Sequence, residues 1–370
     1  MLLITYIRGD NKTVRLVIRL AEGEIYSQME TGWKGTMSVE ELIKDTSMGR
    51  PHVVVIGAGA SVAALPNGDS NGKTLPVMDN VVEIVGLEPV LERNGIEYEG
   101  KNFEAIYSEL YEKSAYQETL RVIESRIRAY FRELKLPPYP TIYDHLVLSL
   151  REKDLIASFN WDPFLYQACW RNHRKVNLPH TAYLHGNVAV GYCLKDSQMG
   201  LAGTQCPKCG DTYTDSKLIF PIKKKDYSKA PFIAAEWDDL RHALKHAYLL
   251  TIFGYGAPQS DIEAIKLMKE AWGNVAARNL EDVGIIDIKS EEHLRNTWQD
   301  FIHTHHYHVT GDFYDSDIAM FPRRTCEAEW NASMECRFLV PNSIPREIGF
   351  GELWAWYGAL ATAEERDTAT

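Results

Sequence analysis

The stretch HVVVIGAGAS, residues 52–61, limits the possible folds of this chain more than any other segment. Four apolar residues follow His52 without a polar residue between them. A strand of that kind has both faces buried, which is typical of a parallel sheet covered by helices on each side. The glycine-rich second half permits a tight turn out of the strand and into a helix. We therefore expect a layered α/β fold around this strand.

Four further apolar runs end in polar or glycine residues in the same way: LIASF before Asn160, TAYL before His185, YLLTIF before Gly254 and VGIID before Ile288. Helical patterns separate several of them, at 163–174, 236–246 and 261–272. Regular alternation of strands and helices indicates a doubly wound sheet. The predicted fold class is α/β, with a Rossmann-like parallel sheet.

Around that core the sequence predicts additional segments. Residues 1–50 contain an alternating apolar pattern from Val14 to Leu20, which predicts a β-hairpin extension. The α/β core would span 51–310, with a helical insertion at 101–150 that begins with one long helix at 101–134, and a small cysteine-containing module at 190–230. Residues 311–370 are rich in aromatic side chains and predict an extension for packing or oligomerisation, whose tail from Ala361 frays.

Composition excludes several classes of function. The 370 residues carry a net charge of -11 and no long basic run, so direct nucleic-acid binding is not expected. Six cysteines are too few for a disulfide framework, and no apolar stretch is long enough for a membrane span. We expect a cytoplasmic protein that does not enter membranes. Lys223, Lys224 and Lys225 would form a solvated turn, or else a patch facing an acidic ligand or partner.

Chemistry-bearing residues stand where the predicted strands end. Ligands of open α/β sheets bind beyond the carboxyl ends of the strands, and Gly57, Asn160, His185 and Gly254 all fall there. The glycine turn suits a diphosphate, although Val62 occupies the place of a third glycine in the dinucleotide fingerprint. Taken singly, the turn can be purely structural, Asn160 a turn cap, and His185 a buried histidine.

Together these motifs resemble the sirtuin superfamily. The chain carries, in order, Gly-Ala-Gly-Ala-Ser at 57–61, Asn-Trp-Asp at 160–162, His185-Gly186 and a Cys-x-x-Cys at 206–209. It is most similar to the sirtuin-like NAD-hydrolysing domains of bacterial anti-phage systems, over about residues 50–300. The resemblance implies that NAD is the substrate.

The resemblance also assigns roles to particular residues. Asn160 would orient a water or the ribose hydroxyls, Asp162 would hold the nicotinamide carboxamide, and His185, titrating near neutrality, would be the general base. The diphosphate would lie on Gly57, Ala58, Gly59, Ala60 and Ser61, with Gly254, Tyr255 and Gly256 on the other side of the cofactor. Asp287 would bind the adenosine ribose, or else form an ordinary strand-end turn.

Departures from the deacylase pattern favour hydrolysis. Phe159 replaces the glutamine of deacylase sirtuins, and the arginine-containing motif that follows their glycine turn is missing. We therefore expect hydrolysis of NAD to nicotinamide and ADP-ribose by a defence effector that depletes the cofactor. The alternatives are an NAD-dependent protein deacylase and a non-catalytic module that senses NAD or ADP-ribose. Regulation would come from homo-oligomerisation, or from a partner such as a DNA-translocating ATPase, an Argonaute or a sensor protein.

Two histidine or cysteine groups have metal-ligand character. Cys206 and Cys209 resemble half of a structural zinc site, and Cys193 lies nearby, but a fourth ligand is not evident in the sequence. The alternative is a knuckle that keeps its turn without zinc. The run HTHHYH contains His303, His305, His306 and His308, which would either end a surface strand or bind a metal through alternate histidines.

Overall fold

The computed structural model describes residues 3–8, 14–20, 23–25, 35–222 and 225–367. Its centre is a six-stranded sheet in which all neighbours are parallel, in the order β13-β12-β11-β5-β6-β7. These strands are β5 (His52–Ile56), β6 (Leu155–Ser158), β7 (His180–Tyr183), β11 (Leu249–Phe253), β12 (Asp282–Ile286) and β13 (Tyr307–Thr310). The chain builds the sheet outward from β5 in both directions, so the predicted doubly wound α/β fold class is confirmed.

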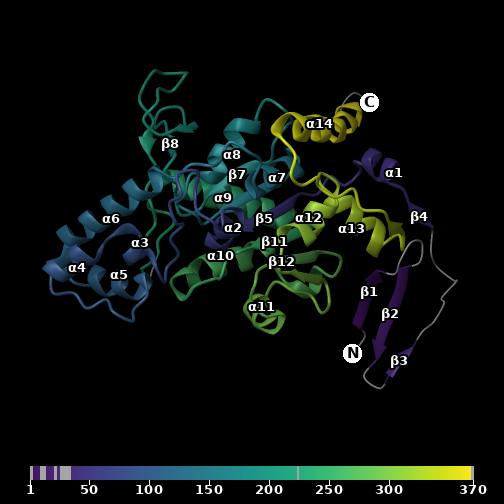
Figure 1. Cartoon of the computed structure of the whole chain (residues 1–370), viewed down its shortest axis with the longest axis horizontal. Helices are drawn as coiled ribbons and strands as arrows, with labels where there is room; N and C mark the ends of the chain where they lie inside the picture. The colour runs from purple at the N-terminus through teal and green to yellow at the C-terminus, as the bar shows by residue number, and fades with distance from the viewer. Residues whose placement is uncertain (1–2, 9–13, 21–22, 26–34, 223–224, 368–370) are drawn as a thin grey trace.

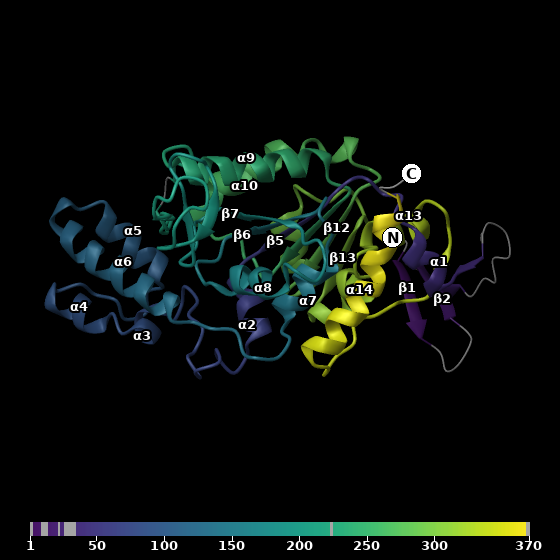
Figure 2. The same cartoon turned by 90° about the horizontal axis from the view of Figure 1, so that it is seen from above.

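Helices cover both faces of this sheet (Figure 2). One face carries α2 (Ala58–Ala64), α7 (Ile142–Ser149) and α8 (Phe164–Asn172), and the other carries α9 (Pro231–His246) and α10 (Ile262–Trp272). α11 (Glu291–Trp298) connects β12 to β13. The apolar residues of β5, from Val53 to Ile56, are completely buried, as a strand covered on both faces requires. No helix of the described ranges is long and apolar enough to cross a bilayer.

The helical insertion projects from one end of the molecule (Figure 1). It comprises α3 (Val81–Val85), α4 (Glu88–Arg93), α5 (Phe103–Tyr111) and α6 (Gln117–Arg132). The single helix predicted at 101–134 is wrong, because a short 3-10 turn at Ser114–Tyr116 separates α5 from α6. The break lets the apolar stripes of the two helices, which include Ile106 and Ile123, pack together instead of facing water.

A small antiparallel sheet follows β7. It consists of β8 (Val190–Tyr192), β9 (Met199–Leu201) and β10 (Thr214–Asp215), in the order β10-β8-β9. This module stands apart from the main sheet in Figure 1 and contains three of the cysteines.

The terminal segments lie at the end of the molecule opposite the helical insertion (Figures 1 and 2). β1 (Leu3–Arg8), β2 (Val14–Leu20) and β3 (Gly23–Ile25) form an antiparallel sheet, and the turn between β1 and β2 lies outside the described residues. β4 (Thr36–Met37) pairs in parallel with β14 (Phe338–Leu339). The remaining helices are α1 (Val39–Lys44), α12 (Asp317–Met320), α13 (Thr325–Ser333), α14 (Phe350–Asp367), and the 3-10 turns at Gln259–Asp261, Val275–Ala277 and Phe313–Asp315.

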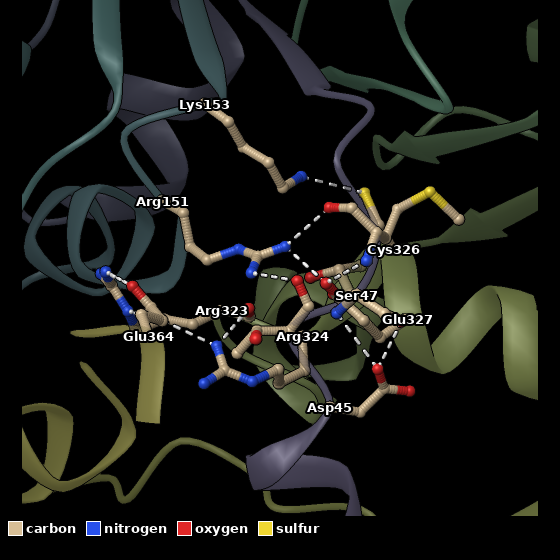
Figure 3. Close-up of polar contacts among 12 residues, drawn as sticks. Asp45, Ser47, Arg151, Lys153, Arg323, Arg324, Cys326, Glu327 and Glu364 are labelled. Carbon is tan, nitrogen blue, oxygen red and sulfur yellow. Dashed lines mark hydrogen bonds and ion pairs between the residues drawn. The ribbon is translucent and has the colours of Figure 1, made fainter. Parts of the chain in front are cut away.

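Buried arginines connect the C-terminal helices to the sheet domain at the end where its parallel strands begin (Figure 3). Glu364 of α14 accepts hydrogen bonds from Arg323 at 2.6 and 2.7 Å and from Arg324 at 2.7 Å. Arg151 pairs with Glu327 of α13. The prediction that the tail frays from Ala361 is wrong for residues 361–367, because α14 continues to Asp367 and the ion pairs of Glu364 hold it, while residues 368–370 lie outside the described residues.

Candidate functional site

The carboxyl ends of the strands lie level with one another. Ile56 of β5 is in register with Phe253 and Ser158, and the register continues to Tyr183 on one side and Ile286 on the other. The chain order reverses between β5 and β11, which is where doubly wound sheets bind ligands. The predicted residues Gly57, Asn160, His185, Gly254 and Asp287 all lie within two residues of these strand ends.

The glycine turn packs directly against the end of β11. The Gly59 N–H donates to the Gly254 carbonyl at 2.9 Å. A Cβ at Gly57 would lie 2.6 Å from the Gly254 carbonyl oxygen, and one at Gly254, where φ is +59°, would lie 2.3 Å from the Ala60 nitrogen. Glycine is therefore required at both strand ends for this close approach. Ala58 and Gly59 remain exposed on the outer side of the turn.

A buried polar group lies beneath this turn, and we call it the serine–aspartate cluster: Ser61, Tyr143, Asn160 and Asp162. The Ser61 hydroxyl donates to Asp162 Oδ2 at 2.6 Å and contacts the Tyr143 hydroxyl at 2.7 Å. Asn160 Nδ2 lies 2.9 Å from the Gly57 carbonyl, 3.1 Å from Ser61 Oγ and 3.2 Å from the Tyr143 hydroxyl. The motif residues of two neighbouring strand ends thus form one hydrogen-bonded group.

Burial controls the protonation of Asp162. Desolvation raises the pKa of this carboxyl to about 6, against the opposing hydrogen bonds from Ser61 and the Phe164 N–H. A carboxyl with that pKa changes charge close to physiological pH, which is a property common at functional sites.

A second group, the histidine–aspartate cluster, contains His185, Lys225, Tyr227, Tyr255 and Asp261. His185 Nε2 lies 3.1 Å from the Tyr227 hydroxyl and 3.7 Å from Asp261 Oδ1. Asp261 also pairs with Lys225 and accepts a hydrogen bond from Tyr255 at 2.8 Å. Lys225 is buried in this ion pair, so the prediction of a solvated turn is wrong for Lys225, while Lys223 and Lys224 lie outside the described residues.

The protonation of His185 differs from expectation. Burial lowers the pKa of this histidine to about 3, although Asp261 acts in the opposite direction. The expectation of a histidine that titrates near neutrality is therefore wrong, because the site removes the imidazole from water. Near pH 7 the ring is neutral, so it accepts a proton only weakly but can accept or donate a hydrogen bond.

Phe159 separates the two clusters. Its ring stacks on Tyr255 at 4.0 Å between centroids, and the His185 ring meets it edge-on at 4.8 Å. The Tyr255 ring thus covers one face of Phe159. The Phe159 side chain offers no hydrogen-bond donor or acceptor, so it contributes only an apolar surface between the neighbouring polar residues.

The remaining predicted cofactor residues lie at the rim. Gly256 is exposed, with the Lys289 ammonium 3.4 Å from a Cβ built at that glycine. Asp287 is half-buried and accepts a hydrogen bond from the Lys289 N–H at 3.0 Å, which is the strand-end turn of the alternative interpretation.

Three cysteines and one aspartate converge in the small module. One ligand atom from each of Cys193, Asp196, Cys206 and Cys209 lies within 4.8 Å of the others. Cys206 Sγ is 3.3 Å from Asp196 Oδ2, and Cys193 Sγ is 3.4 Å from Cys209 Sγ. Three thiolates and a carboxylate are a donor set that suits tetrahedral zinc, so these residues fit a structural zinc ion.

The sequence reasoning missed several members of these groups. Asp196 stands three residues after Cys193, the spacing of a metal knuckle, and this signal could have identified it as the fourth ligand. Tyr143, Tyr227 and Asp261 carry no comparable local signal, because only the tertiary fold brings them to the strand ends.

No protein-family model matches the sequence, and no curated protein matches it. Solved structures do match: a Sir2 homologue–NAD complex, at 13% identity over 80% of this chain and 96% of that one, has a TM-score of 0.39. A structure described for the mechanism and regulation of Sir2 enzymes matches at 13% identity over 79% of this chain and 99% of that one, with a TM-score of 0.36. Sir2Af2 bound to a myristoylated histone peptide matches at 13% identity over 80% of this chain and 96% of that one, with a TM-score of 0.32. The assignment of the fold rests on the strand order of this chain itself.

Proposed function

We propose that this protein is an NAD hydrolase that releases nicotinamide and ADP-ribose. The observation that carries the proposal is the placement of Asn160 and His185 after adjacent strands, with Asn160 bonded to the glycine turn and His185 packed against Phe159. The order of sirtuin-like motifs in the sequence supports NAD as the substrate.

The reaction breaks the bond between nicotinamide and ribose. Water adds to the anomeric carbon of the ribose, nicotinamide leaves with the bonding electrons of the broken bond, and the proton that the water loses passes to the solvent. Asn160 would orient the water or the ribose hydroxyls, and neutral His185 would hold it by a hydrogen bond. Above pH 6 Asp162 is mainly a carboxylate and would accept the carboxamide N–H.

The same geometry argues for restraint of the activity. Tyr255 covers one face of Phe159 and is tied to Asp261, so a nicotinamide ring would reach that face only after Tyr255 moves. Unrestrained hydrolysis would deplete cellular NAD. We propose an effector, in anti-phage defence, whose assembly or partner displaces this segment.

The test is to incubate the purified full-length chain with NAD and to follow nicotinamide and ADP-ribose by chromatography. Asn160→Ala and His185→Ala should each abolish release, while far-ultraviolet circular dichroism stays native. His242→Ala, at an exposed position of α9, is the matched control and should keep full activity. Equal release by all four proteins would overturn the assignment of both residues.

Two other outcomes would replace the proposal with a different function. NAD bound without release, with and without candidate partners, would indicate a sensing module. Turnover of a labelled acetyl-peptide would indicate a deacylase despite Phe159.

A further inference from the structure

Four side chains of metal-ligand type gather near the amino ends of β12 and β13. The proposed NAD site lies at the opposite, carboxyl ends of the strands. Asp282 begins β12, His308 lies on β13, Asp317 begins α12, and Glu329 lies within α13. One ligand atom from each of Asp282, His308 and Glu329 lies within 4.8 Å of the others. His308 Nδ1 is 3.1 Å from Asp282 Oδ2 and 3.4 Å from Asp317 Oδ2. We call these four residues the carboxylate–histidine cluster.

The cluster has more negative than positive charge. Within the described ranges, Asp282 and Asp317 form ion pairs with His308 alone, and neither they nor Glu329 pair with a lysine or arginine. Three carboxylates therefore share one imidazole, and Asp282 among them is buried. Such an arrangement attracts a cation, because carboxylates held close together repel one another when a counter-charge is lacking.

A buried hydroxyl without a partner supplies a second, independent observation. Tyr248 is completely buried, and its hydroxyl lacks a hydrogen-bond partner among the described residues. Tyr248 directly precedes Leu249, which pairs with Asp282 across β11 and β12, and its ring lies 6.1 Å from that of Trp330, the residue after Glu329. An unsatisfied buried hydroxyl is rare in native proteins, and a water held by a cation would satisfy it.

A small cavity adjoins the cluster. It has a volume of about 20 Å³ and is lined by His308, Asp317, Thr251, Thr310 and Ser316, among others. This volume is sufficient for one water molecule. The Thr310 hydroxyl, on the cavity wall, also lacks a partner among the described residues. A cation at the cluster would thus have room for a water ligand beside its protein ligands.

We propose that the carboxylate–histidine cluster binds a divalent cation of the type that prefers oxygen and imidazole ligands, such as Mn²⁺. Asp282, His308 and Glu329 would be direct ligands, with Asp317 and a cavity water completing the coordination. The ligands come from two strands of the sheet and two helices of the C-terminal extension, so the cation would fasten α12 and α13 to the sheet. Of the four histidines in HTHHYH, only His308 belongs to the cluster, and carboxylates distant in sequence, rather than neighbouring histidines, complete it.

The test is titration of the full-length protein with Mn²⁺, followed by the electron paramagnetic resonance signal of free Mn²⁺. The wild type should bind one ion per chain, and Glu329→Gln or His308→Gln should weaken binding by roughly tenfold or more. The matched control is Asp300→Asn, an exposed carboxylate paired with Lys269. Cys206→Ser separates this site from the cysteine module and should leave Mn²⁺ binding unchanged.

A second measurement distinguishes loss of the metal site from loss of the folded structure. Mn²⁺ should raise the thermal midpoint of the wild type and of Asp300→Asn but not that of Glu329→Gln, whose circular dichroism should stay native. The proposal is overturned if the wild type does not bind Mn²⁺, if Glu329→Gln and His308→Gln bind it as tightly as the wild type, or if Cys206→Ser abolishes the binding.

Discussion

At the scale of single residues, burial decides the chemistry of the site. The carboxyl of Asp162 and the imidazole of His185 are both removed from water, and desolvation favours the neutral form of each. The pKa of the acid therefore rises to about 6, while that of the histidine falls to about 3. A sequence motif identifies the residue types, but only their surroundings set these values.

His185 should make the protein sensitive to acid. In the unfolded chain its pKa is near 6.5 and in the folded protein about 3, so between these values the unfolded state binds more protons. Stability is complete above pH 6.5 and falls with decreasing pH, by about 1.4 kcal/mol for each pH unit from this group. The free energy of unfolding, measured with urea at several pH values in that window, should fall less steeply with decreasing pH in His185→Gln than in the wild type. The difference in slope should correspond to one bound proton.

The control for this prediction is His242→Gln, at an exposed position. The prediction fails if His185→Gln and the wild type lose stability in parallel as the pH falls.

At the scale of elements, close backbone approaches fix how the strand ends meet. The turn before α2 lies against the end of β11, and the glycines on both sides leave no room for a side chain. In the small module, the knuckle at Cys206 and Cys209 and the loop from Cys193 to Asp196 bring four side chains of metal-ligand type together. The glycine turn is therefore held by its contact with the end of β11, and the two cysteine segments of the small module are held by their contact with each other.

Gly59→Ala should destabilise the protein although the backbone conformation at Gly59 permits alanine. The new Cβ would lie 2.8 Å from the Gly254 Cα and 2.9 Å from its carbonyl oxygen, so one strand end must shift. Overpacking of this kind costs about 1–3 kcal/mol. Urea unfolding measures the loss, and Gly311→Ala, where a Cβ meets no atom within 4 Å, should leave stability nearly unchanged. If Gly59→Ala left the free energy of unfolding unchanged, the close packing of Gly59 against Gly254 would be refuted.

We predict that the purified protein contains one zinc ion and that its removal by a chelator unfolds the cysteine module. Asp196→Ala should lower zinc affinity by about tenfold or more, because it removes one of four ligands. Metal analysis after dialysis measures the effect. Cys336→Ser, which changes an exposed free cysteine outside the module, is the control. Full zinc retention by Asp196→Ala would exclude the aspartate as a ligand.

At the scale of the whole molecule, the C-terminal extension is fastened to the sheet domain by buried charges. Arg323 and Arg324 are almost fully buried, and Glu364 is the carboxylate that both contact (Figure 3). Arg323 also donates to the carbonyls of Leu148 and Leu150 at the end of α7. The network thus links the last helix of the chain to the helical layer on one face of the sheet.

Glu364→Gln should therefore destabilise the entire protein. Two buried guanidinium groups would lose their shared negative partner, and removal of one partner from a buried ion pair costs about 3 kcal/mol. Thermal unfolding should show a lower midpoint, whereas Glu352→Gln, an exposed change on the same helix, should not. Equal midpoints for the two variants would contradict the role of the network.

Sequence alone determined the buried parallel strands, the glycine turn, and the polar residues placed after Ser158 and Leu184. These features are local, because burial on both faces excludes polar residues from a strand and a close backbone approach excludes side chains. Tertiary structure decided which side chains meet. Tyr143 reaches Ser61, Asp261 reaches His185, and Tyr255 covers Phe159 across wide sequence separations. The protonation of His185 follows from such contacts, since desolvation depends on neighbours that no local pattern specifies.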